Sequence, residues 1–251
     1  MSACTLDGIC GGCRYSAMPY DEQLAMKQSQ LLALLYEGKR EKEKKGATPL
    51  KGVMSEDSVW EGIIPSPQEY GYRNKMEYSF GDEEKDGPLT LGMHRMKSFY
   101  SVVTFDCCLL VHPDFNVIVK AVREFFDERH IPYMHKKTHE GYLRHLLLRR
   151  SAATGELMIV LVTKSDGEIR IGVQPGSTTD TQQSEDSQIA ESMNVEVQPG
   201  MEGRIFDAGK LLAEFRDMLL ALPLEGKIAG ILHTKNDALA DAVVDEGTEV
   251  L

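Results

Sequence analysis

At 251 residues, the chain is long enough for one large domain or two small ones with a buried core. Its hydrophobic content of 42% and charged content of 27% are ordinary for a soluble globular protein, and no apolar run approaches the roughly 20 residues that a membrane span needs. The opening segment MSACTLDGICGGC lacks the basic start and apolar core of a secretory signal. We therefore expect a cytoplasmic protein with no membrane partner.

The net charge of −11 is unevenly distributed along the chain. Residues 166–251 hold 17 Asp and Glu against 6 Lys and Arg, which accounts for the whole net charge, whereas residues 1–165 hold 22 of each sign. Because local patches rather than net charge decide binding to phosphate, the acidic total does not exclude an RNA partner. The basic residues between positions 130 and 150 are Lys136, Lys137, Arg144, Arg149 and Arg150.

The first 46 residues predict a loop followed by a helix. Residues 1–18 are rich in Cys and Gly and lack hydrophobic periodicity, as expected of a loop folded around a ligand. Asp21 is placed to cap a helix over residues 22–36, where leucines recur at helical spacing. The charged run that follows predicts a solvated helix end or linker. The expected parts of the chain are a cluster-binding loop (1–18), a helix with a charged linker (19–46) and a central domain (47–251).

Beyond residue 70, alternating hydrophobic residues predict strands and amphipathic stretches predict helices. The expected strands are 72–80, 89–93, 98–104, 143–150, 157–163 and 227–233, with another beginning in the final segment 245–251. The expected helices are 115–126 and 208–222. The polar stretch 172–204 predicts a flexible insertion in a surface loop. The fold class is therefore α+β, with a mainly antiparallel sheet covered by two or three helices.

The most informative motif is Cys4-x5-Cys10-Gly-Gly-Cys13, which can direct three thiolates at one centre because glycines permit a tight backbone. A fourth thiolate must come from Cys107 or Cys108. Four thiolates suit an iron–sulfur cluster or a structural zinc, and the single Cys-x-x-Cys pair favours iron–sulfur. A redox Cys-x-x-Cys would lie at a helix start after a strand, and neither is predicted there. The alternative is that the cysteines are unconnected surface thiols that share no ligand.

These residues resemble the iron–sulfur branch of the RNA uridine-5-methyltransferase family, of the 23S rRNA uracil-5-methyltransferase type. The spacing of Cys4, Cys10 and Cys13 matches the family pattern, and a Y-x-x-Q-L-x-x-K helix follows at Tyr20. The resemblance covers nearly the whole chain. The other similar segments are 72–81, 91–102, 141–163 and 229–237.

The resemblance implies a 4Fe-4S cluster held by Cys4, Cys10, Cys13 and Cys108, because the family's fourth cysteine lies five residues before a proline; Cys107 is the substitute. It also implies a thiolate that attacks carbon 6 of uracil, so that carbon 5 accepts a methyl group from S-adenosylmethionine. No cysteine follows Cys108, and the family's S-adenosylmethionine domain and N-terminal barrel have no counterpart in the sequence. We therefore expect an inactive portion of a longer enzyme, with the cofactor bound only through the missing catalytic domain.

Basic residues on the predicted strands are candidates for holding RNA phosphates. Arg73 and Lys75 share one face of strand 72–80, and Arg144, Arg149 and Arg150 lie on strand 143–150. The alternative is that these are solvated strand faces without a partner. With the resemblance counted, we predict that these five residues contact structured, ribosomal RNA, with no DNA partner and in a monomeric chain.

The predicted function is RNA binding by the iron–sulfur portion of an S-adenosylmethionine-dependent RNA uracil-5-methyltransferase. The cluster is expected to be structural, joining the N-terminal loop to the helix after Cys108. The alternative is a stand-alone iron–sulfur or zinc module without methyltransferase activity. A third possibility is a redox protein, which would need an accessible cluster.

Overall fold

The computed structural model describes residues 4–44, 61–85, 87–104, 107–136, 138–165, 167–171, 204–239 and 243–251. The predicted insertion at 172–204 therefore lies, except for its last residue, outside the described residues. The chain forms two compact units, one of residues 1–7 with 13–69 and the other of residues 8–12 with 70–251. In the described part of both units, no helix is long and apolar enough to cross a membrane.

The first unit contains helix α1 (Tyr20–Lys44), which begins two residues earlier and ends later than the predicted 22–36. Asp21 lies in its first turn, where a carboxylate interacts favourably with the helix dipole. The side-chain amide of Gln23 donates to the carbonyls of Tyr15 and Met18, at 3.0 and 2.9 Å. The hydroxyl of Tyr20 accepts a hydrogen bond from the Ser66 amide at 2.7 Å. Two residues of the family-like helix motif thus hold the turn and the segment beside this helix.

The second unit is built on a seven-stranded sheet in the order β3-β2-β1-β4-β5-β8-β9. Its strands are antiparallel except for the parallel pair β5 and β8, so the prediction of a mainly antiparallel sheet is confirmed. A separate pair of short strands, β6 and β7, precedes the last helix. The strands are β1 (Lys75–Gly81), β2 (Thr90–His94), β3 (Val102–Thr104), β4 (Leu143–Arg150), β5 (Leu157–Thr163), β6 (Glu168–Arg170), β7 (Ile205–Asp207), β8 (Ile228–Lys235) and β9 (Thr248–Val250).

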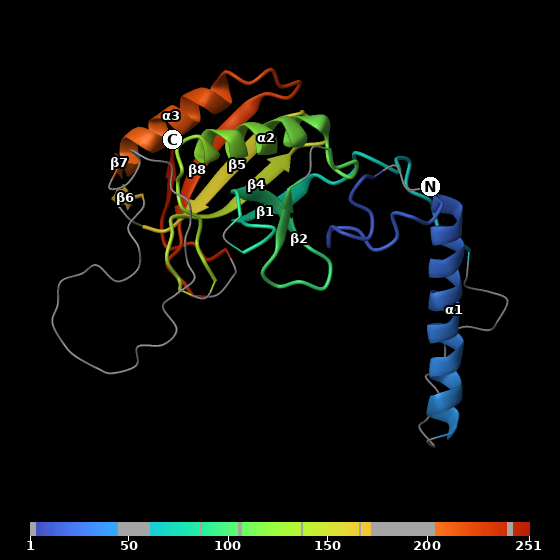
Figure 1. Ribbon diagram of the computed structural model, residues 1–251. Coiled ribbons are helices and arrows are strands. Elements are labelled where there is room, and N and C mark those ends of the chain that lie inside the picture. Colours follow the sequence, from blue (N-terminus) through green and yellow to red (C-terminus); the bar gives the residue numbers. More distant parts are fainter. Residues whose placement is uncertain are drawn as a thin grey trace, which may run out of the picture. The chain divides into compact units, whose positions relative to one another are not determined.

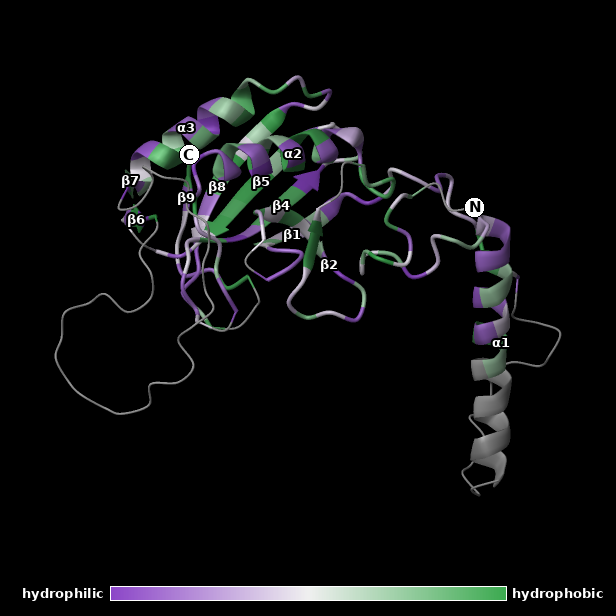
Figure 2. Cartoon of the chain, in the orientation of Figure 1, coloured by the Kyte–Doolittle hydropathy of each residue, from purple (hydrophilic) through white to green (hydrophobic). Residues whose placement is uncertain are grey.

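Two helices, α2 (Pro113–Asp127) and α3 (Ala208–Leu220), lie along one face of this sheet (Figure 1). Both match the predicted helices 115–126 and 208–222 within a few residues. Phe126 of α2 stacks on Phe215 of α3 at 5.4 Å between ring centroids, and it meets Phe80 of β1 edge-on at 5.7 Å. All three rings are buried, and the strands β5 and β8 below the helices are mainly hydrophobic (Figure 2). The core therefore lies between the sheet and these two helices.

Alternation along the strands sorts side chains between the two faces of the sheet. Since Phe80 meets α2, the buried Tyr78 and Met76 also face the helices. The intervening residues of β1 and their partners on β4 point to the opposite side, which we call the far face. The far-face residues of these two strands are Lys75, Glu77, Ser79, His145, Leu147 and Arg149.

Polar contacts of one histidine join strands β5, β8 and β9, at the edge of the sheet that β9 forms. The buried His233 on β8 lies 2.8 Å from the Thr163 hydroxyl through Nε2 and 2.9 Å from the Glu249 carboxylate through Nδ1. The hydrogen bond from His233 lowers the pKa of Glu249 below its ordinary value. The succession of hydroxyl, imidazole and carboxylate resembles a catalytic triad. However, Thr163 is fully buried and also donates to the carbonyl of Lys164. The arrangement therefore ties β5, β8 and β9 together instead of facing a substrate.

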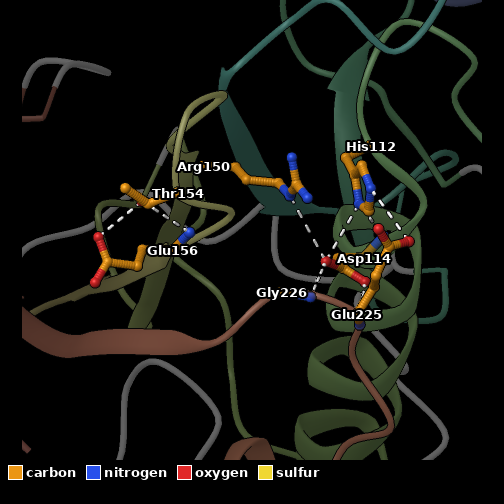
Figure 3. Close-up of polar contacts among 7 residues, drawn as sticks. All are labelled: His112, Asp114, Arg150, Thr154, Glu156, Glu225 and Gly226. Atoms are coloured by element: carbon orange, nitrogen blue, oxygen red, sulfur yellow. Dashed lines mark hydrogen bonds and ion pairs between the residues drawn. The ribbon is translucent and has the colours of Figure 1, made fainter.

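The buried carboxylate of Asp114 joins three segments that are far apart in the sequence (Figure 3). It lies in the first turn of α2 and accepts hydrogen bonds from the amides of Glu225 and Gly226, both at 2.9 Å. Nδ1 of His112, the residue that caps α2, is 3.2 Å away, and Nε of Arg150 at the end of β4 is 3.8 Å away. One carboxylate therefore fixes the start of α2, the end of β4 and the turn before β8.

We expect Asp114→Ala to lower the free energy of unfolding by about 3 kcal/mol, because it leaves two part-buried amides and a nearby cation without their buried acceptor. Urea denaturation measures this change. Asp217→Ala is the matched control: that carboxylate is exposed, pairs only with its neighbour Arg216 among the contacts described, and should change stability by no more than about 0.5 kcal/mol. Equal effects of the two variants would contradict a joining role for Asp114.

Candidate functional site

The five cysteines lie in different settings. Cys4 and Cys13 belong to the first unit and Cys10 and Cys108 to the second; Cys107 is exposed and the other four are half-buried. Within the described ranges, no three His, Cys, Asp or Glu side chains are grouped as a metal site. The predicted four-thiolate cluster site is therefore not shown by the structure, and iron–sulfur binding stays a prediction.

The segment around Cys10 nonetheless has a local geometry that suits a thiolate ligand. It pairs with the end of β2: Cys10 bridges Arg95, and the Gly11 amide donates to the His94 carbonyl at 2.8 Å. A Cβ on Gly11 would lie 2.8 Å from that carbonyl oxygen, so the close approach requires glycine. The Gly12 amide points at Sγ of Cys10 at 3.4 Å, and such hydrogen bonds stabilise sulfur ligands of clusters.

Cys108 precedes α2 and is held against the start of this helix by a reciprocal pair of hydrogen bonds. The backbone amide of Cys108 donates to the side-chain oxygen of Asn116 at 2.9 Å. The side-chain amide of Asn116 donates to the backbone carbonyl of Cys108 at 3.3 Å. Burial raises the pKa of Tyr78 well above its ordinary value; the nearby thiol of Cys108 raises it further and Arg73 acts in the opposite direction. The Asn116 side chain thus fixes the backbone of Cys108, whereas the side chain of Cys107 is exposed.

The basic residues of β4 do not form the single patch that the sequence suggested. Arg149 is exposed on the far face, where its register partner is Lys75 of β1. Arg150, one residue later, points to the helix side and approaches Asp114. Lys75 is also exposed and lies 3.5 Å from Glu77 on its own strand, whereas Arg73 is half-buried just before β1. The alternation of the strand therefore separates the two adjacent arginines.

Arg144 requires a correction, because it is buried and not part of a surface. Arg144 is only 4% exposed, and its Nη1 donates to the carbonyls of Asn236 and Ala238 at 2.7 and 2.6 Å. These bonds hold the loop after β8 against β4. The sequence could not reveal this, because a charged residue next to hydrophobic ones on a strand looks the same whether it faces solvent or a loop.

We expect Arg144→Ala to lower the free energy of unfolding by about 3 kcal/mol, because the buried Asn236 carbonyl and the part-buried Ala238 carbonyl lose a charged donor. Arg144→Lys should recover only part of this loss, since an ammonium group cannot reproduce the planar fork of donors. Arg149→Ala, on the same strand but exposed, should change stability by no more than about 0.5 kcal/mol. Thermal and urea denaturation compare the three variants; an Arg144→Ala protein as stable as Arg149→Ala would refute the assignment.

Sequence reasoning missed an aromatic hairpin between β2 and β3. Phe99 and Tyr100 are 65% and 57% exposed at its tip, next to Lys136 from the loop before β4. Nζ of Lys136 donates to the Phe99 carbonyl at 2.8 Å and lies 4.5 Å from the centre of the Phe99 ring. We expected both residues on a strand over 98–104, but β3 begins only at Val102, which leaves them in the turn. The available signal was two adjacent aromatic residues between Ser98 and Ser101.

Comparison with known proteins shows similarity to RNA methyltransferases. A protein of Clostridium acetobutylicum named an uncharacterized RNA methyltransferase is 34% identical over 94% of this chain and 40% of its own length. A similarly named protein of Caldanaerobacter subterraneus subsp. tengcongensis is 33% identical over 100% of this chain and 43% of its own length. The tRNA (uracil(54)-C(5))-methyltransferase of Pyrococcus horikoshii is 29% identical over 64% of this chain and 33% of its own length.

No family model matches the chain. The chain spans 40% and 43% of the length of the two bacterial relatives. Its similarity to them covers 94% and 100% of its own residues. The chain is thus homologous to a part of proteins named RNA methyltransferases, and one of its more distant relatives is a tRNA uracil-5-methyltransferase.

Proposed function

We propose that this chain is an RNA-contacting part of an S-adenosylmethionine-dependent RNA uracil-5-methyltransferase, acting on structured and specifically ribosomal RNA. Two lines of support meet here. The two relatives named RNA methyltransferases cover 94% and 100% of the chain, and the more distant relative's name specifies carbon 5 of uracil. The second line is the exposed pair of cations on the far face of the sheet.

The observation that carries the proposal is the pairing of Lys75 with Arg149 across β1 and β4. Two like charges directly opposite on one face destabilise a sheet. A phosphate between them replaces that repulsion with two attractions, and an exposed Arg can hold phosphate oxygens with two parallel hydrogen bonds. Arg73, half-buried two residues before β1, extends the surface. Arg144 and Arg150 are left out of it, because their guanidinium groups contact the protein itself.

None of the five cysteines is proposed as the thiolate that attacks uracil. Cys10 is paired to β2 and Cys108 to α2 through their backbones, and the resemblance assigns both to a cluster. We therefore expect the 251-residue chain to bind RNA without methylating it. The alternative, a metal-binding module unrelated to methyl transfer, predicts no preference for RNA over other polyanions such as heparin.

The combined change Lys75→Ala and Arg149→Ala should weaken binding to a ribosomal RNA fragment by about tenfold at moderate salt. Each lost phosphate contact lowers the slope of log affinity against log salt by about 0.7 to 0.9, so the slope should fall by about 1.5. Fluorescence anisotropy at several salt concentrations measures both quantities.

The matched control for this experiment is Lys120→Ala with Arg216→Ala, which removes the same charge from α2 and α3 on the other side of the sheet. Its affinity and salt slope should stay close to those of the wild type. If both pairs weaken binding equally, only net charge matters and the far-face surface is wrong. Formation of 5-methyluridine by the chain with S-adenosylmethionine would show that the catalytic groups are within these residues.

We propose further that Cys4, Cys10, Cys13 and Cys108 bind a 4Fe-4S cluster with a structural role. Chain purified without air should be brown and contain about four irons, and Cys13→Ser should lose the iron and most of the soluble protein. Cys107→Ser is the control, because that side chain is exposed and should be dispensable. Colourless protein with one zinc would favour the alternative module, and an iron-free but folded Cys13→Ser variant that binds RNA normally would refute the structural role.

A further inference from the structure

The far face of the sheet carries a carboxylate and apolar side chains next to its pair of cations. Lys75, Arg149 and Met158 lie side by side across β1, β4 and β5. In the next row on the same face, Glu77 lies opposite Leu147. Leu147 and Met158 are half-buried, so part of each apolar side chain reaches the surface. This surface therefore combines two cations, one carboxylate and an apolar floor.

The charges of this surface do not cancel. Glu77 lies 3.5 Å from Lys75 on the same strand, and their side chains are 38% and 46% exposed. An exposed ion pair of this kind contributes little stability, and one carboxylate cannot balance two cations. Arg149 on the neighbouring strand therefore keeps its attraction for phosphate. A carboxylate accepts hydrogen bonds and cannot donate one, so Glu77 repels phosphate and attracts the N–H groups of a base.

Guanine suits a carboxylate better than the other bases of RNA do. Its pairing edge presents two adjacent N–H donors, N1–H and the N2 amino group. The two oxygens of a carboxylate accept such a pair in parallel, as they do from arginine. In uracil, adenine and cytosine, each donor on this edge is next to an acceptor that a carboxylate repels. The edge is available only in an unpaired base, and such bases are recognised in loops and bulges.

We propose that Glu77 recognises one unpaired guanine of the bound RNA, while Arg149 holds a phosphate of the same strand. Successive residues on one face of a strand are about 7 Å apart, so Glu77 and the cation pair are within reach of one nucleotide. The base lies on Leu147, the register partner of Glu77. The ammonium of Lys75 orients the carboxylate. The inference rests on the proposed function, because it takes RNA as the partner and adds which base is selected.

RNA hairpins with one common stem and a uridine loop that carries a single guanosine, inosine, adenosine or cytidine test the proposal with the full chain. Wild type should bind the guanosine loop about tenfold more tightly than the adenosine or cytidine loop, which is the discrimination expected of one bidentate contact. Inosine lacks the N2 amino group, so its loop should bind about threefold more weakly than the guanosine loop. Fluorescence anisotropy measures the four affinities.

Three variants locate the selection. Glu77→Gln, folded by circular dichroism, should lose the preference for guanosine, because an amide presents one acceptor oxygen next to a donor. Arg149→Ala should weaken binding of all loops by a similar factor and keep the preference, since it removes only a phosphate contact. Glu124→Gln is the matched control. This exposed carboxylate of α2 lies 3.7 Å from its neighbour Arg123, and its replacement should leave the preference intact.

The outcomes separate this proposal from the proposed function. A Glu77→Gln protein that binds every loop more tightly by one factor, with its preference unchanged, would show that Glu77 only repels RNA and would overturn the proposal. Equal binding of all loops by the wild type also overturns it, while leaving the cation pair standing. Loss of the preference in Glu124→Gln would overturn it too, because the selection would not be local to the far face. No binding of any loop by the wild type would overturn the RNA-contacting function itself, and with it this inference.

Discussion

The arrangement of the second unit depends on the buried carboxylate of Asp114. A buried charge is costly unless several partners satisfy it. Here two amides and a guanidinium from distant segments do so, together with the imidazole of the neighbouring His112. The same contact fixes where α2 starts relative to β4, and Gly226 must be glycine because a Cβ there would lie 2.4 Å from the Gly155 carbonyl oxygen. Since α2 also carries Asn116, this one site sets the position of Cys108.

The sheet then converts a run of basic residues into separate roles. Arg144 closes a loop from within the protein, Arg150 neutralises Asp114 on the helix side, and Arg149 reaches solvent opposite Lys75. Strand alternation produces this division, because neighbouring residues point to opposite faces. The consequence for function is that the far face offers a compact pair of cations, instead of a broad basic surface, and such a pair can fix the register of a phosphate backbone.

The cysteine segment lies against the hairpin between β2 and β3. Residues 9–11 pair with its first strand, while Tyr100 at its tip lines a cavity with Lys136, whose ammonium donates to the Phe99 carbonyl. A rigid hairpin with exposed aromatic rings is costly in water unless a partner covers the rings.

The sequence by itself determined the element types, the mainly antiparallel sheet and the two covering helices, because hydrophobic periodicity is a local property of the chain. It also indicated the homology, through the cysteine spacing and the motif at Tyr20. Only the tertiary structure decided that Arg144 is internal, that β5 and β8 are parallel, and that Tyr100 lines a pocket with Lys136. Those facts depend on which distant segments come together, and a buried arginine and an exposed one have the same local sequence pattern.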